Sequence, residues 1–417
     1  RGQTRFEPKS RGLGDVYKRQ PMMTAWFDAA WTGRKALTID SSQVAGDVSD
    51  FPVLITLNVD AELAAQALAN GDDIVFTAGD GTTQLAHEIE YFDETTGELR
   101  AWVKTDLSGS VDTSIYMYYG NSDATIQQNA AGVWSSNYVG VYHLGESPTG
   151  AAGELADSSG SGNHAVTEGS MDASDSVTTA VGNGLAFDGV DDKLRIPDSA
   201  SLDGLNDAAT FSLWINWADA ADGDHQIIMT SENRFSGGDG YEWASQGDGD
   251  HFFYPDATTP DGNYNLGPNP FTNGQWHHLA ATMDFANKEV KIYVDGDEMT
   301  FNYEGVPTNW TDLSDSGDLL WGGNPDRASR FFLGMMDEIR LADVGAQRSM
   351  AFIDELRRQL QHRLPEHSVL ITGEAYQGSV AIASVVSDLV ESLALALLTI
   401  AIMLTLLLRS PRLGLLA

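Results

Sequence analysis

Two glutamates separated by one residue, Glu88 and Glu90, have the spacing best suited to chemistry in this chain. In a β-strand, residues i and i+2 face the same side, so their carboxyl groups would lie about 5–7 Å apart. Retaining glycoside hydrolases use two carboxyl groups at about that separation, one as nucleophile and one as acid and base. The same pattern also fits an exposed strand face whose carboxylates are simply solvated, and we favour that interpretation.

A second cluster of acids lies in Phe187-Asp-Gly-Val-Asp-Asp192, where Asp188, Asp191 and Asp192 surround an Asp-Gly turn. Hard cations prefer several carboxylate and carbonyl oxygens from one loop, so these residues are candidate ligands for calcium (Ca2+). In the alternative interpretation, Asp188 and the glycine after it only make the turn and the other two carboxylates are solvated.

Aromatic side chains concentrate between residues 233 and 264, among many glycines and aspartates. Exposed aromatic rings beside acidic and amide groups commonly stack on sugar rings. The predicted binding residues are Tyr241, Trp243, Phe252 and Tyr254. The alternative is that these rings close the end of a hydrophobic core.

Other kinds of chemistry find little support. His277 and His278 alternate across a predicted strand, and no third ligand at a suitable spacing completes a zinc site. The chain has no cysteine, which excludes disulfides, thiolate metal sites and cysteine nucleophiles. Nucleophile elbows, phosphate loops and dinucleotide fingerprints are also absent from the sequence.

The composition describes a folded and strongly acidic protein. Hydrophobic residues make up 42% of the 417 residues, which is too many for a disordered chain. The net charge of -36 would repel phosphate backbones, so nucleic-acid binding is disfavoured. Such a surface attracts divalent cations or keeps a protein soluble in salty water.

Short strands separated by turn signals position these candidate residues, so we predict an all-β fold of two β-sandwich (jelly-roll) domains. Clear strand patterns cover residues 34–40, 51–57, 73–77, 87–92, 99–103, 113–119, 141–144, 184–187, 193–196, 210–217, 275–282, 290–294 and 332–341. A short Ala-rich helix is expected over residues 60–68. Asp295-Gly296 predicts a hairpin with a type I′ turn.

Residues 21–137 form the first predicted domain. They contain Trp31-Thr-Gly-Arg-Lys35, Phe51-Pro-Val-Leu-Ile55, Asp72-Asp-Ile-Val-Phe-Thr77, Leu85-Ala-His-Glu-Ile-Glu90 and Tyr116-Met-Tyr-Tyr-Gly-Asn121. With these motifs the segment resembles the bacterial domain of unknown function 2341. The resemblance implies an exported β domain and no known activity.

Residues 138–341 form the second predicted domain. Their motifs are Asp157-Ser-Ser-Gly-Ser-Gly-Asn163, Phe187-Asp-Gly-Val-Asp-Asp192, Phe211-Ser-Leu-Trp214, Trp276-His-His-Leu279, Ile292-Tyr-Val-Asp-Gly296 and Gly334-Met-Met-Asp-Glu-Ile-Arg340. The segment resembles laminin-G-like, concanavalin-type jelly rolls. Rims of these jelly rolls often hold calcium, so the resemblance implies Asp157, Asn163 and Asp337 as further ligands.

The two ends differ from the middle of the chain. Residues 1–20 are basic, lack periodicity and resemble translated sequencing adapter, so we expect them to be disordered. Residues 342–417 contain Leu370-Ile-Thr-Gly-Glu374, a charge-free run at 392–408 and then Arg409-Ser-Pro-Arg412. With these features they are similar to a membrane segment of resistance-nodulation-division exporters, with a helix over 389–408 in the membrane. The hypotheses are an assembly chimera, or a real fusion in which that helix anchors the protein.

Together, these features predict an extracytoplasmic binding or adhesion module, periplasmic or at the cell surface. The expected partner is a glycan or a cell-surface protein, with calcium assisting and no catalysis. One alternative is a glycoside-processing jelly-roll enzyme that uses Glu88 and Glu90. The other is a structural spacer of the cell envelope.

Overall fold

A computed structural model describes residues 25–343 except 45, 135–136, 180, 206–207, 219–225, 232–239, 246–249, 255–263, 269–270, 302, 305–312, 314–316 and 325–329. The adapter-like residues 1–20 and the predicted membrane helix 389–408 therefore lie outside the described residues. Within the described ranges, no helix has the length and apolar character needed to cross a membrane.

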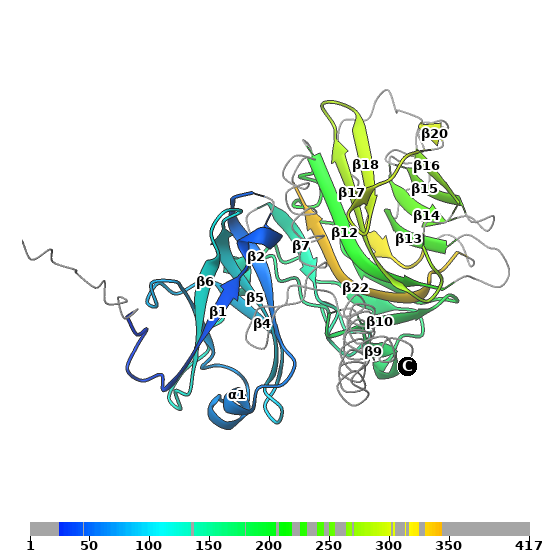
Figure 1. Cartoon of the computed structure of the whole chain (residues 1–417). Coiled ribbons are helices and arrows are strands. Elements are labelled where there is room, and N and C mark those ends of the chain that lie inside the picture. The colour runs from blue at the N-terminus through cyan, green and yellow to red at the C-terminus, as the bar shows by residue number, and fades with distance from the viewer. Residues whose placement is uncertain are drawn as a thin grey trace, which may run out of the picture.

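Two three-stranded antiparallel sheets form the first sandwich (Figure 1). One sheet has the order β1-β6-β3, with β1 (Gly33–Ile39), β6 (Thr113–Tyr119) and β3 (Val75–Ala78). The other has the order β2-β5-β4, with β2 (Val48–Leu57), β5 (Glu98–Leu107) and β4 (His87–Asp93). Alternating apolar residues of both sheets, such as Leu37, Val53 and Ile115, share one buried core.

The second sandwich has two larger antiparallel sheets. The first is β19-β18-β17-β12-β22-β10-β9, with β7 also pairing with β22: β19 (Asp297–Glu298), β18 (Glu289–Val294), β17 (Trp276–Asp284), β12 (Ala208–Trp217), β22 (Leu333–Ala342), β10 (Asn183–Asp188), β9 (Ser176–Thr178) and β7 (Tyr138–Tyr142). The second is β20-β16-β15-β14-β13-β21-β11-β8: β20 (Tyr303–Glu304), β16 (Tyr264–Pro268), β15 (Asp250–Tyr254), β14 (Glu242–Ser245), β13 (Gln226–Ser231), β21 (Leu319–Trp321), β11 (Lys193–Ile196) and β8 (Val166–Glu168). The all-β, two-sandwich prediction is confirmed for the described residues.

Within the described residues, helices are short, and each begins at a side-chain cap. They are α1 (Ala61–Gln66), α2 (Ala130–Val133) and the 3-10 turns η1 (Ser41–Gln43) and η2 (Ala173–Asp175). Asp60 caps α1 by accepting hydrogen bonds from two backbone N–H groups of its first turn. Asp295 and Gly296 both have positive φ, 52° and 81°, as a type I′ turn requires.

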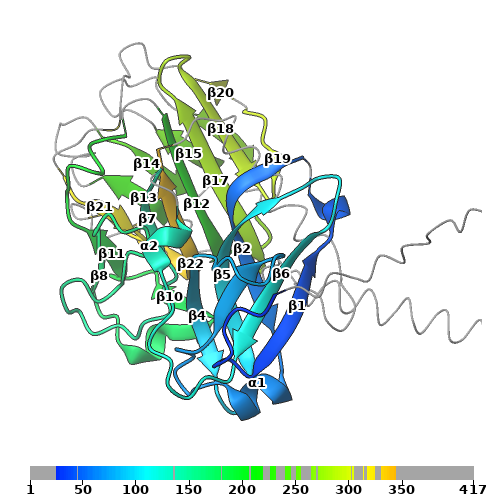
Figure 2. The same ribbon diagram turned by 90° about the vertical axis from the view of Figure 1, so that its left-hand side faces the viewer.

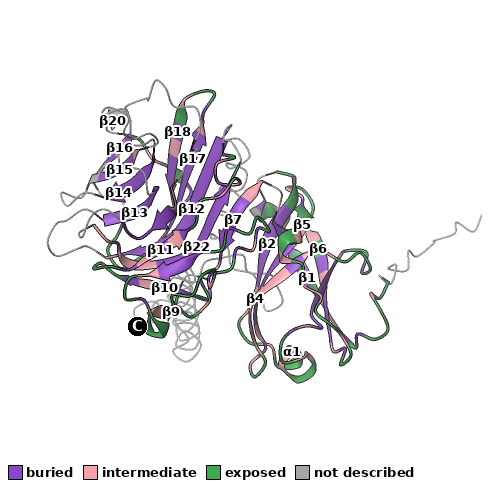
Figure 3. Ribbon diagram, turned by 180° about the vertical axis from the view of Figure 1, so that it is seen from behind, coloured by how far each residue is buried: buried purple, intermediate pink, exposed green. Residues whose placement is uncertain are grey.

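Strand β12 is buried along its whole length, because both of its faces are covered. Phe211, Leu213 and Ile215 point into the jelly-roll core. Trp214, on the opposite face, packs instead with the core of the first sandwich. Figure 3 shows the same burial along β12, β22 and β17. The outer face of this sheet is therefore an interface between the two sandwiches.

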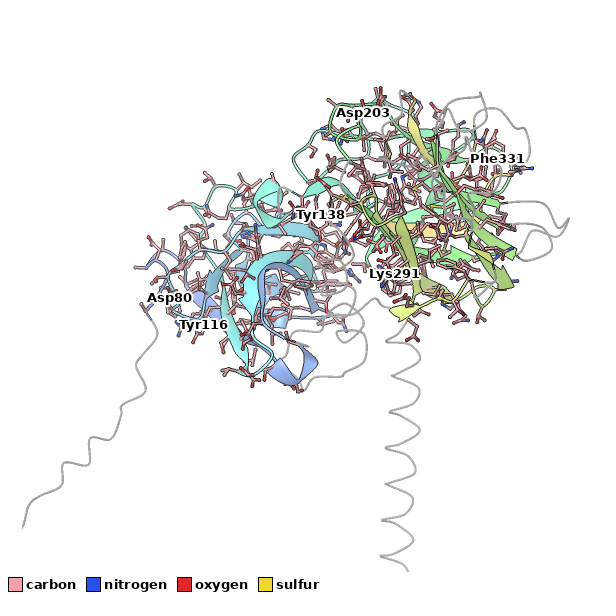
Figure 4. The ribbon with its side chains drawn as sticks, turned by 90° about the horizontal axis from the view of Figure 1, so that it is seen from above. Asp80, Tyr116, Tyr138, Asp203, Lys291 and Phe331 are labelled. Atoms are coloured by element: carbon pink, nitrogen blue, oxygen red, sulfur yellow. The ribbon has the colours of Figure 1, made fainter. Side chains whose placement is uncertain are left out.

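The junction of the sandwiches lies around β7 and the start of the second domain. In Figure 2 the first sandwich lies in front of the jelly roll, and in Figure 4 Tyr138 lies where the two bodies meet. The ring of Tyr138 contacts Trp134 edge-on at 5.3 Å. This junction brings charged residues of β4 and β22 close together.

Candidate functional site

The acidic turn between β10 and β11 brings together the three predicted calcium ligands Asp188, Asp191 and Asp192. One carboxylate oxygen from each lies within 4.8 Å of the others. Asp188 Oδ1 accepts the backbone N–H of Val190 at 2.7 Å, and Asp192 Oδ2 accepts the N–H of Asp188 at 2.9 Å. Asp191 Oδ1 accepts from the hydroxyl of Ser170 at 2.7 Å. The loop thus fixes three carboxylates around one point.

Electrostatics at this turn favour the addition of positive charge. Asp192 is only 1% exposed, whereas Asp188 is exposed. Burial, together with the nearby charges of Asp188, Asp175 and Asp191, raises the pKa of Asp192 to about 6. Either a proton or a bound cation would relieve this repulsion.

The other three predicted calcium ligands do not join this turn, which corrects the expectation of one six-residue site. Asp157 is 7% exposed, and its oxygens accept the backbone N–H groups of Val141, Ser159 and Asn163 at 2.9–3.0 Å. Asn163 donates to the carbonyl of Val139 at 2.6 Å. Both side chains hold the loop after β7 in place, so their polar atoms have protein partners.

Asp337 lies at the interface of the sandwiches instead. It is fully buried, and its Oδ2 accepts from Thr179 Oγ1 at 2.8 Å and from the N–H of Val181 at 2.7 Å. Burial and the neighbouring charge of Glu338 raise the pKa of Asp337 well above its usual value.

The predicted sugar-stacking aromatics are mostly core residues, which corrects the expectation that they are exposed. Tyr241, Trp243 and Phe252 are 6%, 0% and 7% exposed. Trp243 packs edge-on against Phe253 at 5.9 Å inside the jelly-roll core. Tyr254 is half-buried. The alternative stated from the sequence, that these rings fill the core, describes Tyr241 and Trp243, whereas Phe252 is buried and stacks on Tyr254.

A buried charged cluster, which sequence reasoning missed, joins the two sandwiches around His143. His143 directly follows β7, and its ring nitrogen Nδ1 lies 2.6 Å from Glu338 Oε1 and 3.6 Å from Glu90 Oε2. Nε2 lies 3.3 Å from Glu88 Oε2. Arg340 is ion-paired with Glu338. We call these five residues the interdomain cluster.

Two tryptophans of the first domain complete the surroundings of the cluster. Trp102 Nε1 donates to Glu90 Oε2 at 2.8 Å, and Trp134 Nε1 donates to Glu88 Oε2 at 2.9 Å. The guanidinium carbon of Arg340 lies 4.4 Å from the ring centre of Trp102 and 5.1 Å from that of Trp134. The arginine is thus enclosed by aromatic faces and paired with a carboxylate.

Charges inside the interdomain cluster shift its pKa values in opposite directions. Burial disfavours a charged His143, but Glu338 and Glu88 outweigh this effect and raise the pKa of His143 well above its usual value. Burial also acts against ionised Glu338 and Glu88, yet His143 lowers the pKa of both. Burial and the charge of Glu338 raise the pKa of Glu90 well above its usual value.

Two β-bulges determine the direction of the acidic side chains in the interdomain cluster. The pairing of β4 with β5 shifts between Ile89 and Tyr91, so Glu90 is the extra residue. The pairing of β22 with β12 shifts beside Glu338, whose φ is 51°. Met336 and Ile339 both belong to the jelly-roll core, so the bulge turns the two acids between them to the opposite face.

Glu88 and Glu90 therefore share a face, as their spacing predicts, but that face is not exposed. Their side chains are only 12% and 5% exposed. The sequence signal for the cluster is the presence of Asp337, Glu338 and Arg340 in an otherwise apolar strand. Charged residues in such a strand need partners from a covering element.

His278 is buried, and burial together with Arg340 lowers its pKa to about 3. The ring of His277 lies the other way, with Nδ1 2.7 Å from Asp295 Oδ2. The two histidines thus face opposite sides of β17, as their spacing predicts.

These features define a two-sandwich, all-β protein whose second sandwich is a jelly roll of concanavalin type. Residues 188–345 match the family described as the Concanavalin A-like lectin/glucanases superfamily. Residues 70–145 match the family described as Domain of unknown function (DUF2341). Both resemblances seen in the sequence are confirmed, in the predicted order.

Solved structures similar to the chain are distant. Domain 4 of the extracellular arabinanase AbnA from Geobacillus stearothermophilus shares 20% identity, with a TM-score of 0.39, over 52% of this chain and 98% of that domain. The binding domain of botulinum neurotoxin serotype D shares 12%, with a TM-score of 0.40, over 56% of this chain and 53% of its own. A carbohydrate-binding module (CBM40) of a Ruminococcus gnavus sialidase shares 13%, with a TM-score of 0.29, over 36% and 84%. The comparison with curated proteins gave no match.

Proposed function

We propose that this protein is an extracytoplasmic binding or adhesion module whose ligand is a glycan or a cell-surface protein and whose rim binds calcium. The observation that carries the proposal is the turn of Asp188, Asp191 and Asp192, three carboxylates held around one point on a concanavalin-type sandwich. Catalysis is not part of this proposal.

Calcium suits this turn because it accepts six to eight oxygen ligands at 2.3–2.6 Å in flexible geometries. Three carboxylates supply part of that number and neutralise the ion. Because Asp188 is exposed, the remaining positions would face solvent, where water or sugar hydroxyls complete the coordination. A calcium ion held in this way bridges a protein rim to a polar ligand.

Calcium should raise the melting temperature of the protein, and Asp192→Asn should remove that increase. Binding to the folded state alone stabilises it by about 2.7 kcal/mol when calcium is at 100 times its Kd. The measurement is a thermal melt with millimolar calcium and with chelator. Asp297→Asn, an exposed acid of β19 outside the turn, is the matched control and should keep the full calcium response.

Ligand binding can be tested with the same variants on a glycan array and on surface-protein extracts. Calcium-dependent binding that Asp192→Asn loses and Asp297→Asn keeps supports the proposal. Identical melting curves with calcium and with chelator would show that calcium binding is not part of the function. A protein with neither calcium response nor ligand would instead be the structural spacer of the cell envelope.

The enzymatic alternative has one observation in its favour. The pKa of Glu88 is lowered and that of Glu90 is raised, and such a divergence can separate a nucleophile from an acid. However, each carboxylate accepts an indole N–H and both lie beside His143 at a buried interface. We therefore assign them to holding the two domains together.

No release of reducing sugar from polysaccharides is expected from the purified protein or from Glu88→Gln. The reason is that Glu88 already accepts hydrogen bonds from Trp134 and from Ser158 Oγ at 2.5 Å, leaving its oxygens little room for a substrate. A reducing-sugar assay on a panel of polysaccharides measures this. Hydrolysis that is present in the parent protein and vanishes in Glu88→Gln would establish the enzymatic alternative.

A further inference from the structure

The centre of the interdomain cluster has the donor set of a metal site. His143 Nδ1, a Glu90 carboxylate oxygen and a Glu338 carboxylate oxygen all lie within 4.8 Å of one another. They come from the end of β7, from β4 and from β22. Zinc holds nitrogen and oxygen ligands at about 2.0–2.2 Å, which sets neighbouring donors about 3–3.5 Å apart. The observed distances from Nδ1, 2.6 and 3.6 Å, bracket that range.

Each of these three donors is oriented by a further group. In the tautomer with the proton on Nε2, His143 donates to Glu88 Oε2 at 3.3 Å and presents the Nδ1 lone pair to the other two donors. Trp102 donates to Glu90, and Arg340 is paired with Glu338. A carboxylate on the far nitrogen of the histidine and hydrogen bonds to each ligating carboxylate are typical of protein metal sites.

The cluster and its surroundings also hold more carboxyl groups than cationic side chains. Glu88, Glu90, Glu338 and the neighbouring Asp337 supply four carboxyl groups, whereas Arg340 and His143 supply two cations. Asp337 is fully buried, and its Oδ1 has no hydrogen-bond partner among the described residues. Burying ionised carboxylates without matching positive charge is costly, because the interior solvates them poorly. The two carboxyl groups in excess therefore need either protons or a bound divalent ion.

We propose that a divalent transition-metal ion, of the zinc or manganese class, binds His143 Nδ1 together with the carboxylates of Glu90 and Glu338. The imidazole nitrogen selects such an ion over calcium, which prefers oxygen ligands. Glu90 belongs to the first domain, whereas His143 and Glu338 belong to the jelly roll. The ion therefore fastens the two sandwiches, independently of the calcium turn.

The test uses the full chain carrying Asp192→Asn, so that the calcium turn does not contribute. Chelator-treated protein is titrated with Zn2+, Mn2+ and Ca2+ by calorimetry, and bound metal is counted after dialysis. We expect about one equivalent of Zn2+ or Mn2+ to bind at this site and to raise the melting temperature by several degrees. Co2+ should give a visible absorption band that reports an imidazole and carboxylate environment.

Glu90→Gln is the decisive variant, because it keeps an acceptor for Trp102 while removing one ligating charge. This variant should lose the bound equivalent of Zn2+ or Mn2+ and the cobalt absorption band, or bind the metal at least about tenfold more weakly. His143→Gln should do the same. His277→Gln removes a partly exposed histidine–carboxylate pair and should change nothing. Equal metal content in Glu90→Gln and the parent, or no metal in the parent, would overturn the proposal in favour of a purely ionic lock.

Discussion

Replacing Arg340 by methionine should destabilise the protein by about 3–5 kcal/mol, the usual cost of removing one partner from a buried ion pair. Its side chain is 4% exposed, and that of its partner Glu338 is 1% exposed. The substitution removes the guanidinium from the buried Glu338 carboxylate and leaves it with His143 as its remaining cationic partner. It also removes the packing of this guanidinium over Trp102 and Trp134, although methionine keeps part of the apolar contact. Urea denaturation followed by tryptophan fluorescence measures the loss.

A surface arginine provides the matched control for this experiment. Arg195 pairs with Glu168 and Asp318, but its side chain is 34% exposed, so Arg195→Met should cost about 1 kcal/mol or less. Adding Glu338→Gln to Arg340→Met should restore part of the stability, since no ionised carboxylate is then stranded at that position. Equal losses in the two single variants would show that water solvates the interdomain cluster.

The sequence predicted all six strands of the first sandwich and most of the jelly-roll sheet that contains β12, because local signals determine them. Of the opposite jelly-roll sheet it predicted only β11, because the short strands β13 to β16 lie in Gly- and Asp-rich stretches without a clear alternating pattern. The run Thr210–Trp217 combines aromatic, apolar and β-branched residues, and β12 covers Ala208–Trp217. The turn at Asp295-Gly296 followed from the ease with which these residues adopt positive φ. The grouping of Asp188, Asp191 and Asp192 is equally local, since one short loop carries all three.

The interdomain cluster could not be predicted in this way, because it depends on two domains docking and on two bulges. Strict alternation in β22 would put Asp337 and Ile339 on one face and Glu338 on the other. The bulge instead places Asp337 and Glu338 on the same face, toward the first domain. A residue inserted into a ladder leaves the amino-acid pattern nearly unchanged. His143 likewise reads as an ordinary strand residue until β4 is placed beside it.

The aromatic residues illustrate the limit of composition as a guide to exposure. Tyr241, Trp243 and Phe252 lie between acidic, glycine-rich stretches, which suggested a polar surface. In the structure Tyr241 and Trp243, before and within β14, belong to the jelly-roll core, and Phe252 of β15 is buried as well. The composition of neighbouring residues predicts the polarity of the loops at the strand ends. The burial of a strand residue depends instead on which sheet covers the strand.

Trp243→Ala should therefore act on folding and not on ligand contact. Trp243 is fully buried, so its truncation leaves a large cavity and should cost about 3–5 kcal/mol. Tyr254→Ala is the matched control from the neighbouring strand; this ring is half-buried and stacks on Phe252 at 6.0 Å, so we expect a loss of about 1 kcal/mol. Denaturation curves give both values, and glycan binding is then measured where each variant remains folded. Because Trp243 does not reach the surface, binding should fall only with the folded fraction. If Trp243→Ala kept its stability but no longer bound glycan, Trp243 would be a binding residue and its placement in the core would be contradicted.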